Sequence, residues 1–252
     1  MDFIKFLGTA GARVVVSKQL RASGGIWLSL DGTNLSIDPG PGALVKALAS
    51  RPKLDPTTLD GILLSHKHLD HSGDVNAMIE AMTEGTFKKR GAVFAPKEAL
   101  VGDPVILKYV RQYPERLEII KAKAKYKVGS LSFTTPVEHF HHNTETYGFR
   151  FKGKKTTISY IADTRFFPGL VKAYKSSDIL VVSVLRQEPS HLEHLCVDDL
   201  KKLVQGIKPR VTIMTHFGKQ MLAAKPWLIA EHLSQELKTK VIAATDRMTF
   251  SL

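Results

Sequence analysis

Cysteine is nearly absent from this chain, since Cys196 is the single one among 252 residues. One thiol cannot form an intramolecular disulfide, which fits a reducing compartment. The sequence also has no run of about 18 apolar residues, the length that a membrane-spanning helix needs. Its first ten residues, MDFIKFLGTA, lack the basic flank and long apolar stretch of an export signal. We therefore expect a cytoplasmic protein without a membrane segment.

Linkers and repeats are missing too. No Pro/Ser-rich linker, low-complexity tract or internal repeat divides the sequence. With 43% hydrophobic residues, the chain is long enough to bury a sizeable core. We expect residues 1–252 to form a single domain.

Acidic residues are few relative to basic ones, with 24 Asp and Glu against 36 Lys and Arg, a formal net charge of +12. A basic surface attracts polyanions at long range, which favours a phosphorylated or nucleic-acid partner. The alternative is that the lysines only solvate the surface, and composition does not decide between the two. Lysines cluster at residues 87–90, 121–127 and 152–155, and the alternating middle run predicts one basic face of a strand.

Hydrophobic patterning predicts two successive halves in which strands come first and helices follow. Residues 26–40 form two apolar alternating runs around Asp31-Gly32, a strong hairpin signal. Further strands are predicted at residues 3–8, 59–65, 91–96, 147–151, 156–163, 178–184 and 210–215, with two short ones closing the chain, and helices at 42–50, 74–85, 197–207 and about 218–238. Residues 97–127 are expected to hold a short helix and a strand. Two mixed sheets with helices outside would satisfy this order.

The stretch LLSHKHLDHSGD at residues 63–74 is the strongest functional signal. Three histidines and an aspartate lie within six residues, directly after a predicted buried strand. His66 and His68 can point the same way on an extended backbone, and Asp70 and His71 follow at once. Four ligands on so short a loop cannot all bind one ion without strain, but two pairs can serve two neighbouring ions. Imidazole with carboxylate suits zinc, and also manganese or iron.

A polar, solvated turn is the alternative interpretation of that loop, and residues elsewhere argue against it. The segment EHFHHNTETYGFRF offers His139, His141 and His142 beside a strand, while Asp163 and His216 each end another. A lone histidine after a strand is more often structural. Three such strand ends together with the first loop indicate a binuclear metal site at one edge of a sheet.

These residues and their order resemble the metallo-β-lactamase superfamily, in its phosphodiesterase and tRNA 3′-end-processing branch. The similarity runs from FLGTAGAR (6–13) and SIDPGPG (36–42) through SHKHLDHSGD (65–74) to HNTETYGFRF, IADT and THFG. It implies an α/β fold, a four-layer αββα sandwich of two mixed sheets, with two metal ions at one edge. Zinc is the first choice for both ions, with manganese or iron as alternatives.

The resemblance also implies three ligands for each ion and one bridge between the ions. For the first ion the ligands are His66, His68 and His142. For the second they are Asp70, His71 and His216, and the bridge is Asp163. Asp38 matches an aspartate that braces the site without binding metal.

Two of these assignments rest on position. His142 is preferred because it lies six residues before Gly148, as in the family's third motif, while His139 and His141 are rivals. His194, just before the predicted helix 197–207, matches a histidine that serves near the leaving group, and when protonated it would donate a proton there. Asp70 would orient the attacking water as well as bind metal.

The function that the resemblance implies is a metal-dependent hydrolase that acts on a nucleotide or RNA-like phosphodiester. Unlike the tRNA-processing enzymes, the chain has no long glycine-rich basic arm, because residues 97–127 are short. The alternatives are an ester, thioester or lactone hydrolase on the same metal site, and a non-catalytic basic RNA-binding protein. Many relatives in the superfamily pair into dimers, so a homodimer is compatible with the resemblance.

Overall fold

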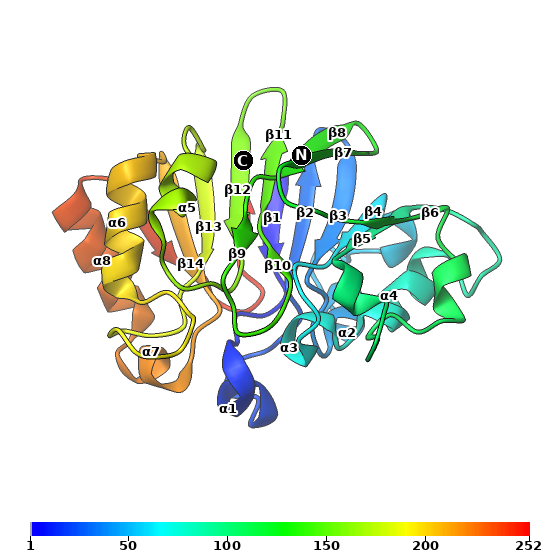
Figure 1. The fold of residues 1–252 in the computed structure, drawn as a ribbon, viewed down its shortest axis with the longest axis horizontal. Coiled ribbons are helices and arrows are strands. Elements are labelled where there is room, and N and C mark those ends of the chain that lie inside the picture. The colour runs from blue at the N-terminus through cyan, green and yellow to red at the C-terminus, as the bar shows by residue number, and fades with distance from the viewer. Residues whose placement is uncertain (1) are drawn as a thin grey trace.

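Two seven-stranded sheets pack face to face in this computed structural model, which describes residues 2–252 (Figure 1). The strand order of the first sheet is β16 (Thr249–Ser251), β1 (Phe3–Phe6), β2 (Ile26–Leu30), β3 (Thr33–Ile37), β4 (Gly61–Leu63), β5 (Ala92–Ala95) and β6 (Arg116–Ile119). That of the second is β15 (Lys240–Ala243), β14 (Val211–Thr215), β13 (Ile179–Ser183), β12 (Thr157–Ile161), β11 (Phe149–Lys152), β8 (Leu131–Thr135) and β7 (Ala124–Val128). β9 (Glu138–His139) and β10 (Thr146–Tyr147) form a separate pair.

Helices lie outside the two sheets, on their outer faces and at one edge of the sandwich (Figure 1). Those of the first part of the chain are α1 (Ala12–Ser17), α2 (Ala43–Leu48), α3 (Leu69–Ser72) and α4 (Val75–Met82), with 3₁₀ helices at Pro56–Thr58, Lys97–Ala99 and Val110–Gln112. Those of the second part are α5 (Pro168–Ala173), α6 (Val197–Ile207), α7 (Lys219–Ala223) and α8 (Pro226–Leu237). The predicted αββα sandwich of two mixed sheets is confirmed. None of the helices within residues 2–252 is long and apolar enough to cross a bilayer.

The layers are held together by three apolar cores, and the two-residue period of the strands separates them. Leu28 points into the central core between the sheets, while its neighbour Trp27 packs under α2 and α4. In the second sheet Val181 lies in the central core, and Val182 packs beneath α5 and α6. Because both faces of the second sheet are covered at its centre, β13 and β14 are buried along their whole length.

Several predicted elements are confirmed and one is wrong. The hairpin of β2 and β3 turns at Asp31 and Gly32, with φ angles of 50° and 80° as a two-residue turn requires. The predicted helix at 197–207 agrees with α6 residue for residue. The single helix expected over about 218–238 is instead split into α7 and α8, because Lys225 is left-handed and Pro226 has no N–H for a continuing helix.

The two sheets are not simply the two halves of the sequence. The middle segment sends β6 to the first sheet and β7 to the second, and β16 returns to pair antiparallel with β1, Phe250 opposite Ile4. Just before β16, the Asp246 carboxylate accepts hydrogen bonds from the Thr9 backbone N–H (2.9 Å), the Thr9 hydroxyl (2.7 Å) and the Ala22 N–H (2.7 Å). Asp246 therefore fixes both ends of the loop that carries α1.

The strands present their functional and basic residues at opposite ends. His66, Asp163 and His216 follow β4, β12 and β14, at the edge where α1 and α3 lie (Figure 1). The lysine-rich turn at 152–155 joins β11 to β12 at the other end of these strands. In β7, Lys125 and Lys127 are exposed and alternate with less exposed neighbours, which confirms the predicted basic face.

Candidate metal centre

The histidine-rich loop changes from extended to helical backbone in the middle of its ligands. It leaves β4, and Ser65 is held by Asp38, whose carboxylate accepts from the Ser65 N–H at 2.6 Å and from its hydroxyl at 2.7 Å. His66 and His68 precede α3, and Asp70 and His71 lie within it. The loop thereby contributes His66 and His68 to one candidate ligand group, and Asp70 and His71 to another.

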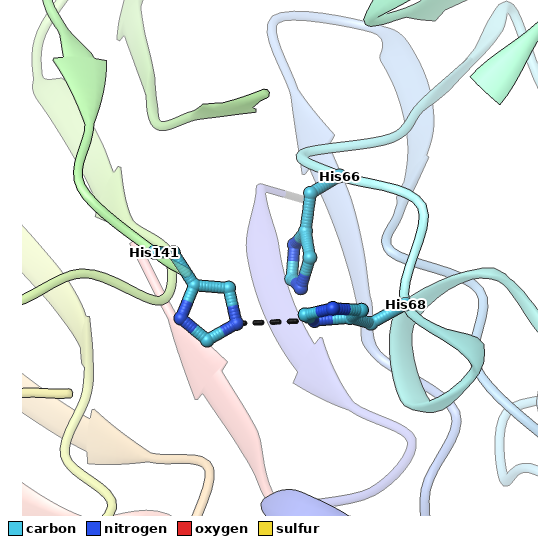
Figure 2. Close-up of side chains that lie close together, drawn as sticks. All are labelled: His66, His68 and His141. Atoms are coloured by element: carbon cyan, nitrogen blue, oxygen red, sulfur yellow. Dashed lines mark hydrogen bonds between the residues drawn. The ribbon is translucent and has the colours of Figure 1, made fainter. Parts of the chain in front are cut away.

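The first group joins His66 and His68 to His141, which comes from the loop after β9 (Figure 2). One candidate ligand atom from each lies within 4.8 Å of the other two. His141 Nε2 is 3.1 Å from His68 Nδ1, and the ring centroids of His66 and His141 are 5.0 Å apart. His141 Nδ1 donates to the backbone carbonyl of Glu193 at 3.1 Å, so that its Nε2 is left to face the group.

In this arrangement His141, rather than the expected His142, groups with His66 and His68. The His142 side chain is exposed, and its ring centroid lies 6.4 Å from that of His68. His142 has a left-handed backbone, φ 50°, and its ring centroid lies 4.7 Å from that of His141, so that the two histidines form a further candidate group with His194. The third rival, His139, is buried behind the site, where its Nε2 hydrogen bonds to the Tyr174 hydroxyl at 2.9 Å.

The second group consists of Asp70, His71 and His216, the combination that the resemblance implies. His71 Nε2 lies 3.0 Å from His216 Nε2, and the latter is 3.4 Å from an Asp70 carboxylate oxygen. His216, at the end of β14, also has a left-handed backbone, φ 62°. Non-glycine residues in this conformation are strained and are concentrated at functional sites.

Asp163 stands between the two groups. One of its carboxylate oxygens is 3.5 Å from His71 Nε2 and 3.6 Å from His141 Nε2, and the other is 3.3 Å from His216 Nδ1. Only 2% of its side chain is exposed. A carboxylate that faces histidines of both groups can bridge two ions, which is the task that the resemblance implies for Asp163.

Charges within the centre are strongly coupled. Burial raises the pKa of Asp163, but the nearby His216 and His71 lower it more, so that the carboxyl is held well below its usual range. Burial lowers the pKa of His71, but Asp163 and then Asp70 raise it more, so that this imidazole holds a proton. Burial lowers the pKa of His68 to about 4. The ionised Asp163 carboxylate thus faces a protonated His71, while His68 is neutral, and a divalent cation would replace the His71 proton.

Three buried polar atoms show that the residues fit such an ion. His66 Nε2, His216 Nδ1 and Asp163 Oδ1 are inaccessible to solvent and have no hydrogen-bond partner. An unpaired buried polar atom is costly, and each of these belongs to a group of imidazoles and carboxylates of the kind that bind zinc, manganese or iron. His66 Nδ1 is already engaged by the Ser65 hydroxyl at 2.9 Å, which leaves Nε2 for a metal.

Asp38 braces the second group from outside. Besides holding Ser65, its carboxylate accepts from His71 Nδ1 and from the Tyr160 hydroxyl, each at 2.9 Å. The bond to Nδ1 orients the His71 ring and directs its Nε2 toward His216. Sequence reasoning gave Asp38 this supporting position but missed Ser65 and Tyr160, although both flank predicted ligands in short buried strands.

Replacing Asp38 by alanine is expected to destabilise the chelator-treated protein by about 3 kcal/mol, since it strands several buried donors at once. Replacing Tyr160 by phenylalanine removes one of these bonds and should cost only about 1 kcal/mol. Urea unfolding of both variants measures the difference. Equal losses would show that Asp38 does not organise this network.

A cavity of about 520 Å³ opens onto both groups, which is large enough for a small ligand. On one side it is lined by His68, Asp70, His141, His142, Asp163 and His194, and on the other by Ala12, Arg13, Val16 and Leu69. Asp70 is 17% exposed, much more than Asp163. His194 Nδ1 lies 3.6 Å from Asp163, and burial lowers the pKa of His194 to about 3, so its ring is neutral at neutral pH.

Comparison with known proteins identifies the family. The sequence matches the family described as the beta-lactamase superfamily domain over residues 33–217. The uncharacterised protein MJ1374 of Methanocaldococcus jannaschii is 31% identical over 250 residues, which cover 96% of this chain and 91% of that protein.

Solved structures share the fold at lower identity. YhfI from Bacillus subtilis, a metallo-beta-lactamase fold protein, has a TM-score of 0.80 at 16% identity, covering 99% of this chain and 98% of its own. A diphosphatase of the PhnP family has a TM-score of 0.72 at 22% identity over 99% and 96% of the two chains. The short form of human tRNase Z has 0.70 at 17% identity over 100% and 99%. The chain therefore belongs to the β-lactamase superfamily and has the metallo-β-lactamase fold.

Proposed function

We propose that this protein is a metal-dependent phosphodiesterase with a binuclear centre. The observation that carries the proposal is that Asp163 faces histidines of both three-residue ligand groups, and that it lines one cavity together with members of each group. The diphosphatase of the PhnP family and tRNase Z, which have this fold, support a phosphorus-centred reaction. The positive net charge of +12 favours an anionic substrate as well.

In this proposal, His66, His68 and His141 hold one divalent ion, Asp70, His71 and His216 hold the other, and Asp163 contacts both. When bound, the two ions would supply a water of lowered pKa and neutralise charge on the phosphodiester oxygens. Zinc is our first choice because nitrogen donors dominate both groups, and manganese or iron would accept the same donors. Asp70, which is exposed to the cavity, accepts a hydrogen bond from the attacking water and so orients it.

His194 is assigned to the leaving group. Because its imidazole is neutral, it acts by donating an N–H hydrogen bond to the leaving oxygen, rather than as the protonated donor expected from the sequence. Its Nδ1 faces Asp163, which leaves Nε2 for the substrate. His194 also forms a candidate metal-binding group with Asp163 and His216. An experiment must therefore distinguish a hydrogen-bond donor to the leaving group from a metal ligand.

Replacing His194 by alanine is therefore expected to lower kcat by about 100-fold, while the metal content stays at the wild-type value. Metal analysis by atomic emission and steady-state kinetics on one preparation give both quantities. His191→Ala is the matched control, because His191 is exposed and lies outside the ligand groups. A parallel loss of metal in His194→Ala would instead make His194 a ligand.

The proposal includes a cytoplasmic location, consistent with a single buried cysteine, and leaves room for a homodimer. RNA is a candidate substrate, but the exposed lysine turn at 152–155 lies at the opposite end of β12 from Asp163. Lysines there are too far away to contact the scissile phosphate.

A substrate panel tests the proposed function. Protein loaded with zinc or manganese is assayed on bis-p-nitrophenyl phosphate, p-nitrophenyl acetate and a lactone. We expect metal-dependent turnover of the phosphodiester that chelator abolishes. Turnover of the ester or lactone alone would show a carboxylic-ester hydrolase on the same centre. Salt-dependent retention of RNA without any turnover would favour a binding protein.

A further inference from the structure

Arg13 is a cation at the mouth of the cavity. It lies in α1, and among the lining residues it is the only lysine or arginine. Its side chain is exposed, and within residues 2–252 it forms no ion pair or hydrogen bond with another side chain. The guanidinium group is therefore available to an incoming ligand, whereas the ligand groups lie buried on the cavity floor.

The segment that carries Arg13 is tied to the metal centre. Ala10 bridges to Phe217, the neighbour of His216, and the Gly11 N–H donates to the Phe217 carbonyl at 3.1 Å. A Cβ on Gly11 would lie 2.3 Å from the His216 carbonyl oxygen, so only glycine fits this approach. Together with the Asp246 contacts at both ends of the loop, this holds Arg13 at a defined place relative to His216.

The position of Arg13 suits a group of the substrate other than the one attacked. A phosphodiester under attack is neutralised by the ions that the floor would hold, and it needs no cation at the mouth. Leu69, 72% exposed, and Val16 also line the cavity. A planar guanidinium binds phosphate through two parallel N–H donors, which makes it selective for that group.

We propose that Arg13 is a specificity-determining residue that binds a second phosphate of the substrate, next to the phosphodiester that is cleaved. The inference rests on the proposed function, because it takes phosphodiester cleavage as the reaction. The substrate class is then a phosphodiester that carries an additional phosphate.

Equilibrium binding tests the contact without turnover. Calorimetry compares thymidine 3′,5′-bisphosphate with thymidine 3′-monophosphate on metal-loaded protein. We expect the extra phosphate to strengthen binding to the wild type by about 10-fold or more, and to have no such effect in Arg13→Gln. Arg13→Lys should keep part of the preference, because it keeps the charge but not the paired donors. Lys18→Gln, on the same loop but outside the cavity lining, should keep all of it.

Kinetics with thymidylyl-thymidine, with and without a 5′-phosphate, provide the second readout. The ratio of the two kcat/KM values should fall in Arg13→Gln and remain at the wild-type value in Lys18→Gln. An unchanged binding ratio in Arg13→Gln, or an equal loss for both substrates, would overturn the inference. If the wild type cleaves neither dinucleotide but the binding ratio still depends on Arg13, the anion site stands and the phosphodiesterase proposal fails.

Discussion

Replacing Asp163 by alanine is expected to lower kcat/KM by at least about 1000-fold, or roughly 4 kcal/mol of transition-state stabilisation. The reason is that Asp163 is the carboxylate that faces His71, His141 and His216 together. Without it, both ions lose a ligand, and the buried imidazoles lose the negative charge around which they gather. Metal content per protein should fall along with activity, which elemental analysis and phosphodiester kinetics measure together.

Asp103→Ala is a suitable control for Asp163→Ala, because Asp103 is exposed in a loop outside the ligand groups. It should leave metal content and turnover at wild-type values. Circular dichroism of both variants establishes that they are folded. Full metal content in a folded Asp163→Ala protein would contradict a bridging carboxylate and leave two independent ligand groups.

The neighbouring histidines 141 and 142 give the second large effect. His141→Ala is expected to abolish turnover, again by about 1000-fold or more, because it removes the third member of the group with His66 and His68. His142→Ala should change turnover by less than about 10-fold, since its exposed side chain lines the cavity without completing that group. Kinetics and zinc affinity of the two variants, differing by one position, decide the assignment.

The opposite result would restore the assignment made from spacing. If His142→Ala loses metal and activity while His141→Ala keeps them, the left-handed turn at His142 does not represent the metal-bound state. His66→Ala serves as the reference for complete loss, because its Nε2 is a buried atom without a partner in the same group.

Local sequence signals predicted most of the fold. The Asp31-Gly32 turn and the amphipathic spacing of residues 197–207 predicted their elements correctly, since turn chemistry and helical periodicity act over a few residues. The break at Lys225 was also present in the sequence as Pro226, and more weight on the missing N–H would have found it. The return of β16 to β1 was not predictable, because strand pairing across more than 240 residues leaves no local pattern.

The candidate site likewise has features that local sequence predicts and features that it does not. The two pairs in the loop at 63–74 and the strand-end positions of Asp163 and His216 follow from sequence. The grouping of His141 with His66 and His68 does not follow from the distance to Gly148, which selects His142. Alternating burial continues from β9 into the loop after it, since His139 and His141 are buried while Phe140 and His142 are exposed.

The contact between Asp246 and Thr9 also sets an order for maturation of the protein. During synthesis Thr9 emerges 237 residues before Asp246, the side chain that accepts both of its hydrogen bonds. Until then, the loop that carries Arg13 lacks the Asp246 contacts at both of its ends, and β1 has no partner on its β16 side. We expect a nascent chain shorter than 246 residues to fold much of its second sheet but to lack an ordered cavity mouth. Substrate selection would then be acquired last, after the metal ligands are already in place.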